Sequence, residues 1–588
     1  MTRPAPGPAA AAGPGTAGDI APADPPAPAR WVRWAAGRWG VAAGSALLAI
    51  GLFTAFIRLS ATYPVNSDGA NIVLMAWDML HGNLLLQGWD MSDVSFWTTE
   101  LPQYMLVGWV RGLGPDVPHI AAAMTYTLAL MLAVLLARGA GTSPDGPSSD
   151  GPSSDGQGGA GTRERLARSL LPAGIMLAPQ LGAGIFVLLL SVGHIGTAVP
   201  VLVTWLVLDR APARWYRPVL AGLLLAWAAI ADPLVLVVGI GPLAAVAAAR
   251  AVRAWRTRSG RGAIGPELSL AGAALAAGGI AAGAPAAIEA LGGYTVHTIP
   301  FHVVTWSTLG AHARTTGLSL LTLFGAGFQG TTAGAPVVFA ALHLVSLVLV
   351  AVALAVVLGR FGARDLIDQV LAVAILANLA FYLASSFSSG VLNSREIAVV
   401  LPFGAALAGR TLGPWLARSG WAAPRTRPWR WTARPRPWVA PALLAVLAGY
   451  AAALGYQLTQ PPAPPANARL ASWLAAHHLT HGLSGYWQAG SVTLDSSGTV
   501  TIRPLVNHFG GLVPYQWEAS RSWFGWRSHD ANFVVLDQQP GYFSYWSPAR
   551  ELRTVFGPPA TTYRTGPYTI MVWHQNLLAA LHHWQSAH

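Results

Sequence analysis

The most constraining feature of this chain is the repetition of apolar runs of about 20 residues, separated by segments rich in Arg, Pro and Gly. An α-helix of that length is about 30 Å long, which matches the hydrocarbon core of a bilayer. The 588 residues are 53% hydrophobic and only 10% charged, too apolar for a soluble multidomain protein. We therefore expect an α-helical polytopic membrane protein.

Eleven apolar runs are candidates for transmembrane helices. They are residues 40–59, 118–138, 168–189, 191–209, 218–231, 233–250, 268–290, 334–358, 369–387, 396–413 and 438–457. Two of them, 191–209 and 218–231, are short and are interrupted or bounded by prolines. The segment 103–113 (QYMLVGWVRGL) is too short to span and is expected to be interfacial or re-entrant.

The distribution of arginine predicts the orientation of the chain. All 36 basic residues are arginine, which together with the many Ala, Gly and Pro residues is typical of GC-rich coding. If the N-terminus is cytoplasmic, 25 arginines lie in segments on the inside and only four in the outside loops before the C-terminal domain. This asymmetry predicts an N-in, C-out topology. It also explains the net charge of +12 without nucleic acid, and the absence of cysteine excludes disulfides and thiolate chemistry.

Composition divides the chain into three parts. The expected parts are a disordered cytoplasmic tail at 1–38, a transmembrane domain at 39–459 and a small extracytoplasmic α+β domain at 460–588. Within the transmembrane domain we expect a first outside loop at 60–117, a low-complexity cytoplasmic linker at 140–162 and an outside loop at 291–333.

The C-terminal domain shows both helical and strand patterns. The expected elements are a helix at 467–481, a hairpin in SVTLDSSGTVTIRPL (491–505), a strand in NFVVLD, a helix in SPARELRTVFG and a strand pair in TTYRTGPYTIMVW.

The polar residues that are unusual in so apolar a chain fall on one predicted side of the membrane. They are Asp68, Asp78, His81, Asp90, Asp93, Glu100, His194, Asp232, His297, His302, Arg395 and Glu396. Ionisable groups near a bilayer are costly unless they line water or a site, so this convergence favours a cavity at the outer interface.

Several of these residues also have ordinary structural interpretations. Asp68 could be a helix N-cap, and Glu100 could cap the short helix that follows it. Asp90 and Asp93 are expected to be solvated in a loop. His194 by itself could be a satisfied polar residue, and Asp232 before a proline could simply form a turn.

Arg395 is harder to explain in that way. It lies on the side depleted of arginine and needs an anionic partner, which could be Glu396, a lipid headgroup or a substrate phosphate.

Four segments together resemble the GT-C superfamily of membrane glycosyltransferases, of the protein mannosyltransferase and aminoarabinose transferase type. The segments are SDGANIVLMAWDMLHGNLLLQGW, SFWTTELPQY, GHIGTAVPVLVTWLVLDR and NSREIAVVLP. The resemblance implies a polytopic N-in protein that uses a sugar linked to polyprenyl phosphate. It covers most of residues 40–460.

The resemblance also implies roles for individual residues. Asp68 maps to the catalytic base or a metal ligand, Glu100 to a second catalytic acid and Arg395 to the site that binds the donor phosphate. Leu101-Pro102-Gln103-Tyr104 departs from the Pro-Pro-aromatic pattern of many members. A divalent cation is possible, with Asp68 and Glu100 as its ligands. Substrate-orienting roles are expected for His194, Asp232, His302, Tyr104 and Trp97.

The sequence thus predicts a transferase in the plasma membrane. It would move a sugar from a polyprenyl-phosphate donor to a glycan, lipid or protein acceptor of the cell envelope. Two alternatives stay open. One is a transporter or flippase of lipid-linked sugars, which would need a polar path across the bilayer. The other is a non-catalytic membrane protein that keeps the fold and binds glycan through the tryptophans of its C-terminal domain.

Overall fold

The structure is a computed structural model of the full chain. It describes residues 30–139, 156–190, 193–212, 214–257, 261–297, 302–331, 333–418, 439–508, 511–538 and 549–587. Contacts divide the chain into two compact units, Met1–Gly51 and Leu52–His588. In the first unit, the described residues form the beginning of helix α1 (Arg30–Ser60). Everything below concerns the second unit.

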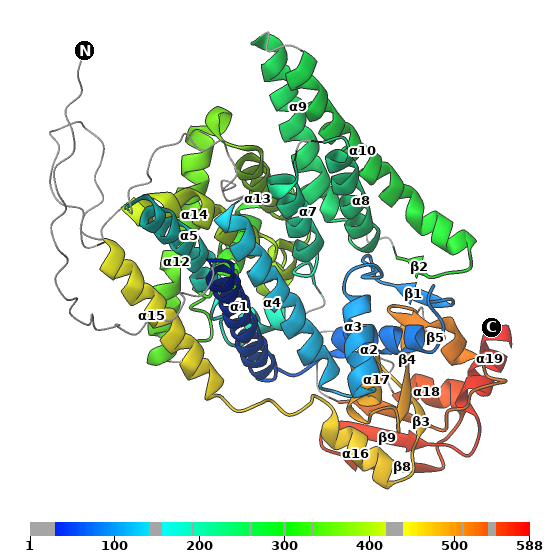
Figure 1. The fold of residues 1–588 in the computed structure, drawn as a ribbon. Coiled ribbons are helices and arrows are strands. Elements are labelled where there is room, and N and C mark those ends of the chain that lie inside the picture. The colour runs from blue at the N-terminus through cyan, green and yellow to red at the C-terminus, as the bar shows by residue number, and fades with distance from the viewer. Residues whose placement is uncertain are drawn as a thin grey trace, which may run out of the picture. The chain divides into compact units, whose positions relative to one another are not determined.

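Helices make up most of the second unit as far as the last apolar run (Figure 1). They are α2 (Ser67–Leu80), α3 (Leu101–Arg111), α4 (Val117–Arg138), α5 (Gly156–Met176), α6 (Ala183–Leu189), α7 (Ala198–Arg210), α8 (Tyr216–Ala231), the π-helical η1 (Leu236–Ile240), α9 (Gly241–Arg256), α10 (Arg261–Ala290), α11 (Leu309–Leu323), α12 (Ala335–Gly359), the short η2 (Phe361–Ala363), α13 (Leu366–Ala384), the 3₁₀ helix η3 (Val391–Ile397), α14 (Val400–Arg418) and α15 (Val439–Leu458).

Seven of these segments are long and apolar enough to cross a membrane, or eight if the bent pair η3 and α14 counts as one span. They match eight of the eleven predicted runs, and the chain is a multi-pass membrane protein. The remaining three runs form shorter or divided helices. The run at 168–189 is divided between α5 and α6, and the runs at 191–209 and 218–231 form α7 and α8, which have only 13 and 16 residues. The count of eleven and the N-in orientation therefore stay predictions.

Several local predictions need correction or fall outside the described residues. Residues 140–155 of the expected linker are not described, and 156–162 belong to α5. Helix α1 begins at Arg30, inside the segment expected to be a tail. The expected loop 291–333 contains a full helix, α11. The short helix expected near 103–113 is confirmed as α3.

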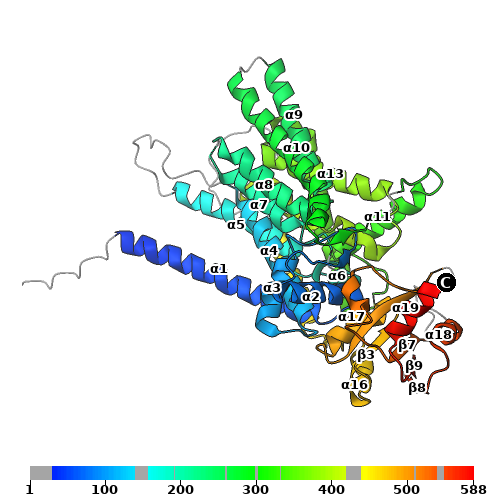
Figure 2. The same ribbon diagram turned by 90° about the vertical axis from the view of Figure 1, so that its right-hand side faces the viewer.

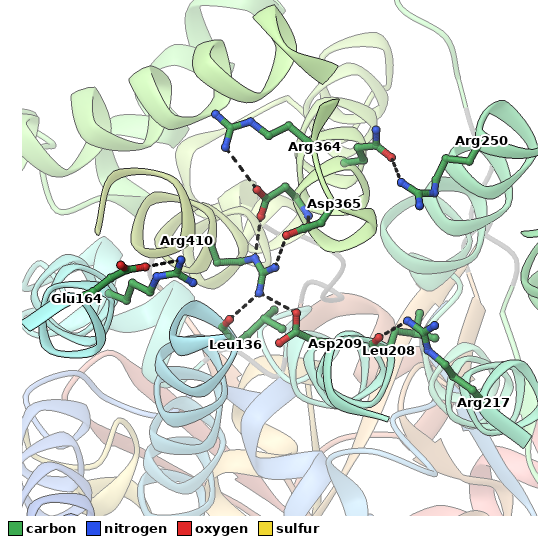
Figure 3. A network of polar contacts seen from close by, with 12 residues as sticks. Leu136, Glu164, Leu208, Asp209, Arg217, Arg250, Arg364, Asp365 and Arg410 are labelled. Atoms are coloured by element: carbon green, nitrogen blue, oxygen red, sulfur yellow. Dashed lines mark hydrogen bonds and ion pairs between the residues drawn. The ribbon is translucent and has the colours of Figure 1, made fainter. Parts of the chain in front are cut away.

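One buried arginine in the middle of α14 contacts the ends of three other helices (Figure 3). The Arg410 guanidinium of α14 donates to Asp368 (2.7 Å) and Asp365 (2.8 Å) near the start of α13. It also contacts Asp209 of α7 at 3.0 Å and the Leu136 carbonyl of α4 at 2.9 Å. Its four contacts therefore hold these helix ends together.

The C-terminal part forms a six-stranded mixed sheet in the order β5-β4-β3-β7-β9-β8. The elements are α16 (Ala468–Ala476), β3 (His481–Ser484), α17 (Tyr486–Asp495), β4 (Thr501–His508), β5 (Gly511–Pro514), β6 (Ala519–Ser520), the 3₁₀ helix η4 (Arg521–Phe524), β7 (Phe533–Asp537), α18 (Ala549–Phe556), β8 (Thr561–Thr565), β9 (Tyr568–Val572) and α19 (Leu577–Ala587). Strands β3, β4 and β7 are parallel, and the outer pairs are antiparallel.

Most predicted elements of this part are confirmed, but the hairpin at 491–505 is wrong. Its first half is helix α17 and its second half is strand β4, which pairs in parallel with β3. Ser497 and Gly498 both have positive φ and end the helix rather than close a hairpin. The helix predicted at 467–481 ends at Ala476, and β3 begins at His481.

A small sheet joins the first loop to the C-terminal domain. Strand β1 (Trp89–Met91) pairs in parallel with β2 (Thr295–Val296) and antiparallel with β6. Beside it, α17 packs against α2, as both ribbon views show (Figures 1 and 2). A Cβ at Gly490 of α17 would collide with the Asn71 side chain of α2, so only glycine permits this approach. The two parts therefore share an interface built around α2.

Asp90 belongs to this interface and is not the solvated residue that the sequence predicted. It is 2% exposed and accepts two hydrogen bonds from Arg521, at 2.9 and 2.5 Å, and one from Thr295. Strand pairing buries it, which a loop assignment could not anticipate.

Candidate functional site

The first candidate residue, Asp68, lies in the first turn of α2 but does not cap the helix. The cap is Asn66, whose side-chain oxygen accepts from the Gly69 N–H at 3.1 Å. This leaves the Asp68 carboxylate available. One of its oxygens accepts from the Tyr486 hydroxyl at 2.7 Å. The other accepts from the Asn66 side-chain amide at 3.3 Å and lies 4.0 Å from Arg395. The carboxylate is 26% exposed, so it can still reach a substrate.

Arg395 extends from the short 3₁₀ helix η3, directly before α14. Its side chain is 36% exposed, and its guanidinium lies 4.0 Å from Asp68 and 3.5 Å from Glu396. Charge-assisted N–H···O bonds are normally 2.7–2.9 Å long, so neither carboxylate saturates it. The guanidinium can therefore accept another anion.

His194 lies between two carboxylates. Its Nδ1 is 2.6 Å from Asp232 and its Nε2 is 2.6 Å from Glu396, and the imidazole side chain is 8% exposed. Both ring nitrogens face carboxylate oxygens at hydrogen-bond distance, so each carries a proton and the ring is an imidazolium. The imidazolium offsets part of the negative charge of Glu396 and so weakens the attraction between Glu396 and Arg395. Arg395 can then bind another anion more readily.

Asp232 also makes the turn that its sequence position predicted. Its second carboxylate oxygen accepts from the Leu234 N–H at 2.8 Å, and Thr197 donates to the first. With 1% exposure it touches only protein groups, so it acts on the cavity through His194.

Two residues of the C-terminal domain complete the surroundings of Asp68. The Tyr486 hydroxyl, at the start of α17, lies 2.7 Å from Asp68 and 2.9 Å from Glu518. A phenol has one proton, so it can donate to one carboxylate only and must accept from the other carboxyl group. Burial and the charge of Asp68 raise the pKa of Glu518 to about 8. Glu518 is therefore the protonated partner, and the order of donation is Glu518 to Tyr486 to Asp68.

Sequence reasoning missed both residues, since they lie 418 and 450 positions after Asp68. The one local signal at Glu518 is conformational. Its φ of 49° is in the left-handed region, which a non-glycine residue adopts at a cost and which clusters at functional sites. That signal is visible only in the folded chain.

One cavity of about 180 Å³ is lined by most of these groups, but not by Asp232 or Tyr486. Its lining is Asp68, Ser92, Asp93, Val94, Phe96, Gly193, His194, Phe387, Asn393, Arg395, Glu396, Trp517 and Glu518. Asp93, expected to be solvated, is part of this lining, and burial together with Glu396 raises its pKa. The cavity thus brings together Asp68, His194 and Arg395, three of the four principal residues predicted from the sequence.

Glu100, the fourth, does not line the cavity. It is 3% exposed and is the N-cap residue of α3, but its side chain makes no capping hydrogen bond. The side chain packs against Gly196, and burial raises its pKa to about 8. Its close hydrogen bond is with the Thr99 hydroxyl. The predicted pairing of Asp68 with Glu100 in one open site therefore has no support in this geometry.

The remaining predicted residues also lie outside the lining. Tyr104 is buried within α3, and the Trp97 indole donates to the Leu84 carbonyl at 2.9 Å. His302 is exposed beyond β2. Within the described residues, no group of three or more His, Asp or Glu side chains could hold a metal ion.

No family model matches the chain, and no curated protein does. Among solved structures, the chain is similar to the crystal structure of ArnT from Cupriavidus metallidurans bound to undecaprenyl phosphate. The two align over 90% of this chain and 98% of that chain, with 13% identity and a TM-score of 0.46. At this similarity, the role of each residue has to be argued from the geometry of this chain.

Proposed function

We propose that this protein is a membrane glycosyltransferase that moves a sugar from a polyprenyl-phosphate donor to an acceptor of the cell envelope. The observation that carries the proposal is the cavity in which the Asp68 carboxylate and the Arg395 guanidinium lie 4.0 Å apart. One group can take a proton and the other can bind a phosphate, and neither is saturated by protein partners.

The reaction that fits is an inverting displacement. Asp68 accepts the proton of an acceptor hydroxyl, whose oxygen attacks the anomeric carbon of the donor sugar. The bond between that carbon and the phosphate oxygen breaks, and the phosphate leaves with the electron pair. Arg395 then stabilises the negative charge that develops on the phosphate.

The groups around these two residues support this division of roles. The Tyr486 hydroxyl orients Asp68 by donating to one of its oxygens. The His194 imidazolium binds Glu396 and thereby holds the carboxylate next to Arg395 in place. Glu518, protonated at neutral pH, keeps a second negative charge away from Asp68.

The lipid donor sets the location. A polyprenyl chain stays in the bilayer, so its phosphate reaches a site that lies at the ends of membrane helices, as η3 and α14 place Arg395. With the orientation predicted from arginine, this face is extracytoplasmic, in the plasma membrane. The acceptor would be a glycan, lipid or protein of the cell envelope.

One observation favours a second candidate, a non-catalytic glycan-binding protein. The second acid expected from the family resemblance, Glu100, does not line the cavity. Such a protein would bind the same donor or a glycan through Arg395 without transfer.

The test is transfer of radiolabelled sugar from a panel of polyprenyl-phosphate donors to cell-envelope acceptors, in membranes that contain equal amounts of folded protein. Asp68→Asn should abolish transfer, whereas Asp530→Asn, a change at an acid whose side chain is 72% exposed, should not. Donor binding that persists in wild type without any transfer would favour the non-catalytic alternative. Full activity of Asp68→Asn would rule out Asp68 as the base.

A further inference from the structure

A second pocket, at the other end of α2, contains a buried cation without a partner. The pocket has a volume of about 330 Å³ and is lined by Leu74, Trp77, Asp78, His81, Trp89, Thr493, Thr501, Ile502, Arg503 and Trp523. His81 follows Asp68 by 13 residues, which is about 20 Å along a helix. The two cavities share no lining residue and are separate sites.

Arg503 lies on β4 and is 8% exposed. Among the described residues, no carboxylate or other acceptor makes a hydrogen bond or ion pair with its guanidinium, which lies over the face of Trp523, 5.5 Å from the ring centre. Burial lowers the pKa of Arg503 to about 10, which leaves it charged at neutral pH. A buried charge without a partner is costly, so this arrangement is explained if an anion binds there.

The other walls of the pocket suit a sugar. Trp77, Trp89 and Trp523 provide aromatic surface, and aromatic rings commonly pack against the apolar faces of sugar rings. Asp78 accepts from the Trp89 indole and from Asn83 through a single oxygen, both at 2.7 Å, so its other oxygen can accept from a hydroxyl. His81 engages the Trp77 carbonyl through Nδ1 at 2.7 Å, so Nε2 is its remaining hydrogen-bonding atom.

We propose that this pocket is a binding site for an anionic saccharide, with Arg503 binding a carboxylate or phosphate group and the tryptophans packing against the sugar ring. The site combines residues of α2 with residues of the C-terminal domain. It does not depend on the transfer reaction proposed for the other cavity, and it would exist equally in a non-catalytic protein.

The test is calorimetric titration of the full chain in detergent with four probes. They are a disaccharide ending in glucuronate, its neutral glucose counterpart, glucose 6-phosphate and inorganic phosphate. Wild type should bind at least one of the anionic sugars at least tenfold more tightly than the neutral sugar and inorganic phosphate. Binding of the glucuronate disaccharide alone would identify a carboxylate ligand, and binding of glucose 6-phosphate alone a phosphate ligand.

Three variants distinguish the pocket from other basic surface. Arg503→Gln should weaken binding of the anionic sugar at least tenfold. Arg527→Gln removes an exposed arginine that stacks on Trp526 at 5.1 Å and should leave binding unchanged. Trp77→Leu should weaken binding of the anionic sugar but not that of inorganic phosphate.

A stability measurement guards against misfolded variants. Because Arg503 is buried without a partner, Arg503→Met should keep or raise the melting temperature of the ligand-free protein while binding is lost. A marked fall in melting temperature would mean that Arg503 supports the fold, and would overturn the proposal. No binding of either anionic sugar to wild type, equal binding of inorganic phosphate, or unchanged binding by Arg503→Gln would also overturn it.

Discussion

The hydroxyl of Tyr486 offers the sharpest test of how the two parts of the chain form one site. Tyr486→Phe removes one oxygen and keeps the aromatic ring that packs against Trp487 and Tyr515. The oxygen makes two hydrogen bonds, 2.7 Å to Asp68 and 2.9 Å to Glu518. Without it, Asp68 loses a donor and the protonated Glu518 loses its acceptor.

The magnitude follows from the charge on Asp68. A hydrogen bond to a charged group contributes roughly 1.5–3 kcal/mol, about twice the value for a neutral pair. If that bond holds the base in its reactive position, its loss lowers kcat/KM by about 10- to 100-fold, at 1.4 kcal/mol per factor of ten. Because the donor phosphate is proposed to bind Arg395 rather than Tyr486, the KM for the donor should change little.

The assay is transfer from the best donor found in the panel, measured with purified protein in detergent at several donor concentrations. The matched control is Tyr568→Phe, which removes a hydroxyl that donates to Asn467 at 2.8 Å elsewhere in the same domain. That variant should retain activity. If Tyr486→Phe is as active as wild type, the C-terminal domain does not position the base, and the proposed order of hydrogen bonds is wrong.

Three further predictions follow from other contacts. The pKa of Glu518 is raised to about 8, so this residue is neutral below that pH and becomes charged above it, beside Asp68. Activity should therefore fall above about pH 8, and Glu518→Gln should remove this fall from the pH profile of kcat/KM. Arg410→Met should lower the free energy of unfolding by roughly 3 kcal/mol, because it leaves buried carboxylates unpaired. Adding Asp209→Asn should restore part of the lost melting temperature in thermal unfolding. An unchanged melting temperature in Arg410→Met would contradict the structural role. Arg521→Gln leaves the buried Asp90 without its cation, so proteolysis between the C-terminal domain and the transmembrane part should become faster. Equal rates of proteolysis in the variant and the wild type would show that this ion pair does not hold the interface.

The sequence predicted the membrane architecture better than it predicted the site. Long apolar runs report spans directly, because bilayer thickness sets their length, and eight runs correspond to long helices. For a short apolar run such as the one that forms α8, the sequence does not show whether the helix crosses the membrane, because burial among other helices and burial in lipid select the same apolar residues. Asp68, His194 and Arg395 could be grouped because each is a polar residue at the end of an apolar run.

The errors have a different cause, which is contact between segments far apart in the chain. Asp90 was expected in water because nothing near it in sequence reveals β2 or β6. The segment 491–505 alternates like a hairpin, yet α17 forms because its apolar side chains pack in the core of the C-terminal domain and α17 also contacts α2. Local propensity is a weak guide where such packing decides the conformation.

The same long-range contacts change the role expected of the C-terminal domain. A domain that only shielded the site would cover the cavity without contacting Asp68, the proposed base. Here Tyr486 donates directly to Asp68, and Glu518 lines the cavity. The domain also supplies Arg503 and Trp523 to the second pocket, whose other wall includes residues of the same helix α2. Because residues of α2 and of this domain help to line both cavities, its docking determines whether either one is complete. We therefore expect variants that loosen the interface, such as Arg521→Gln, to weaken sugar transfer and anionic-saccharide binding together, although Arg521 lines neither cavity.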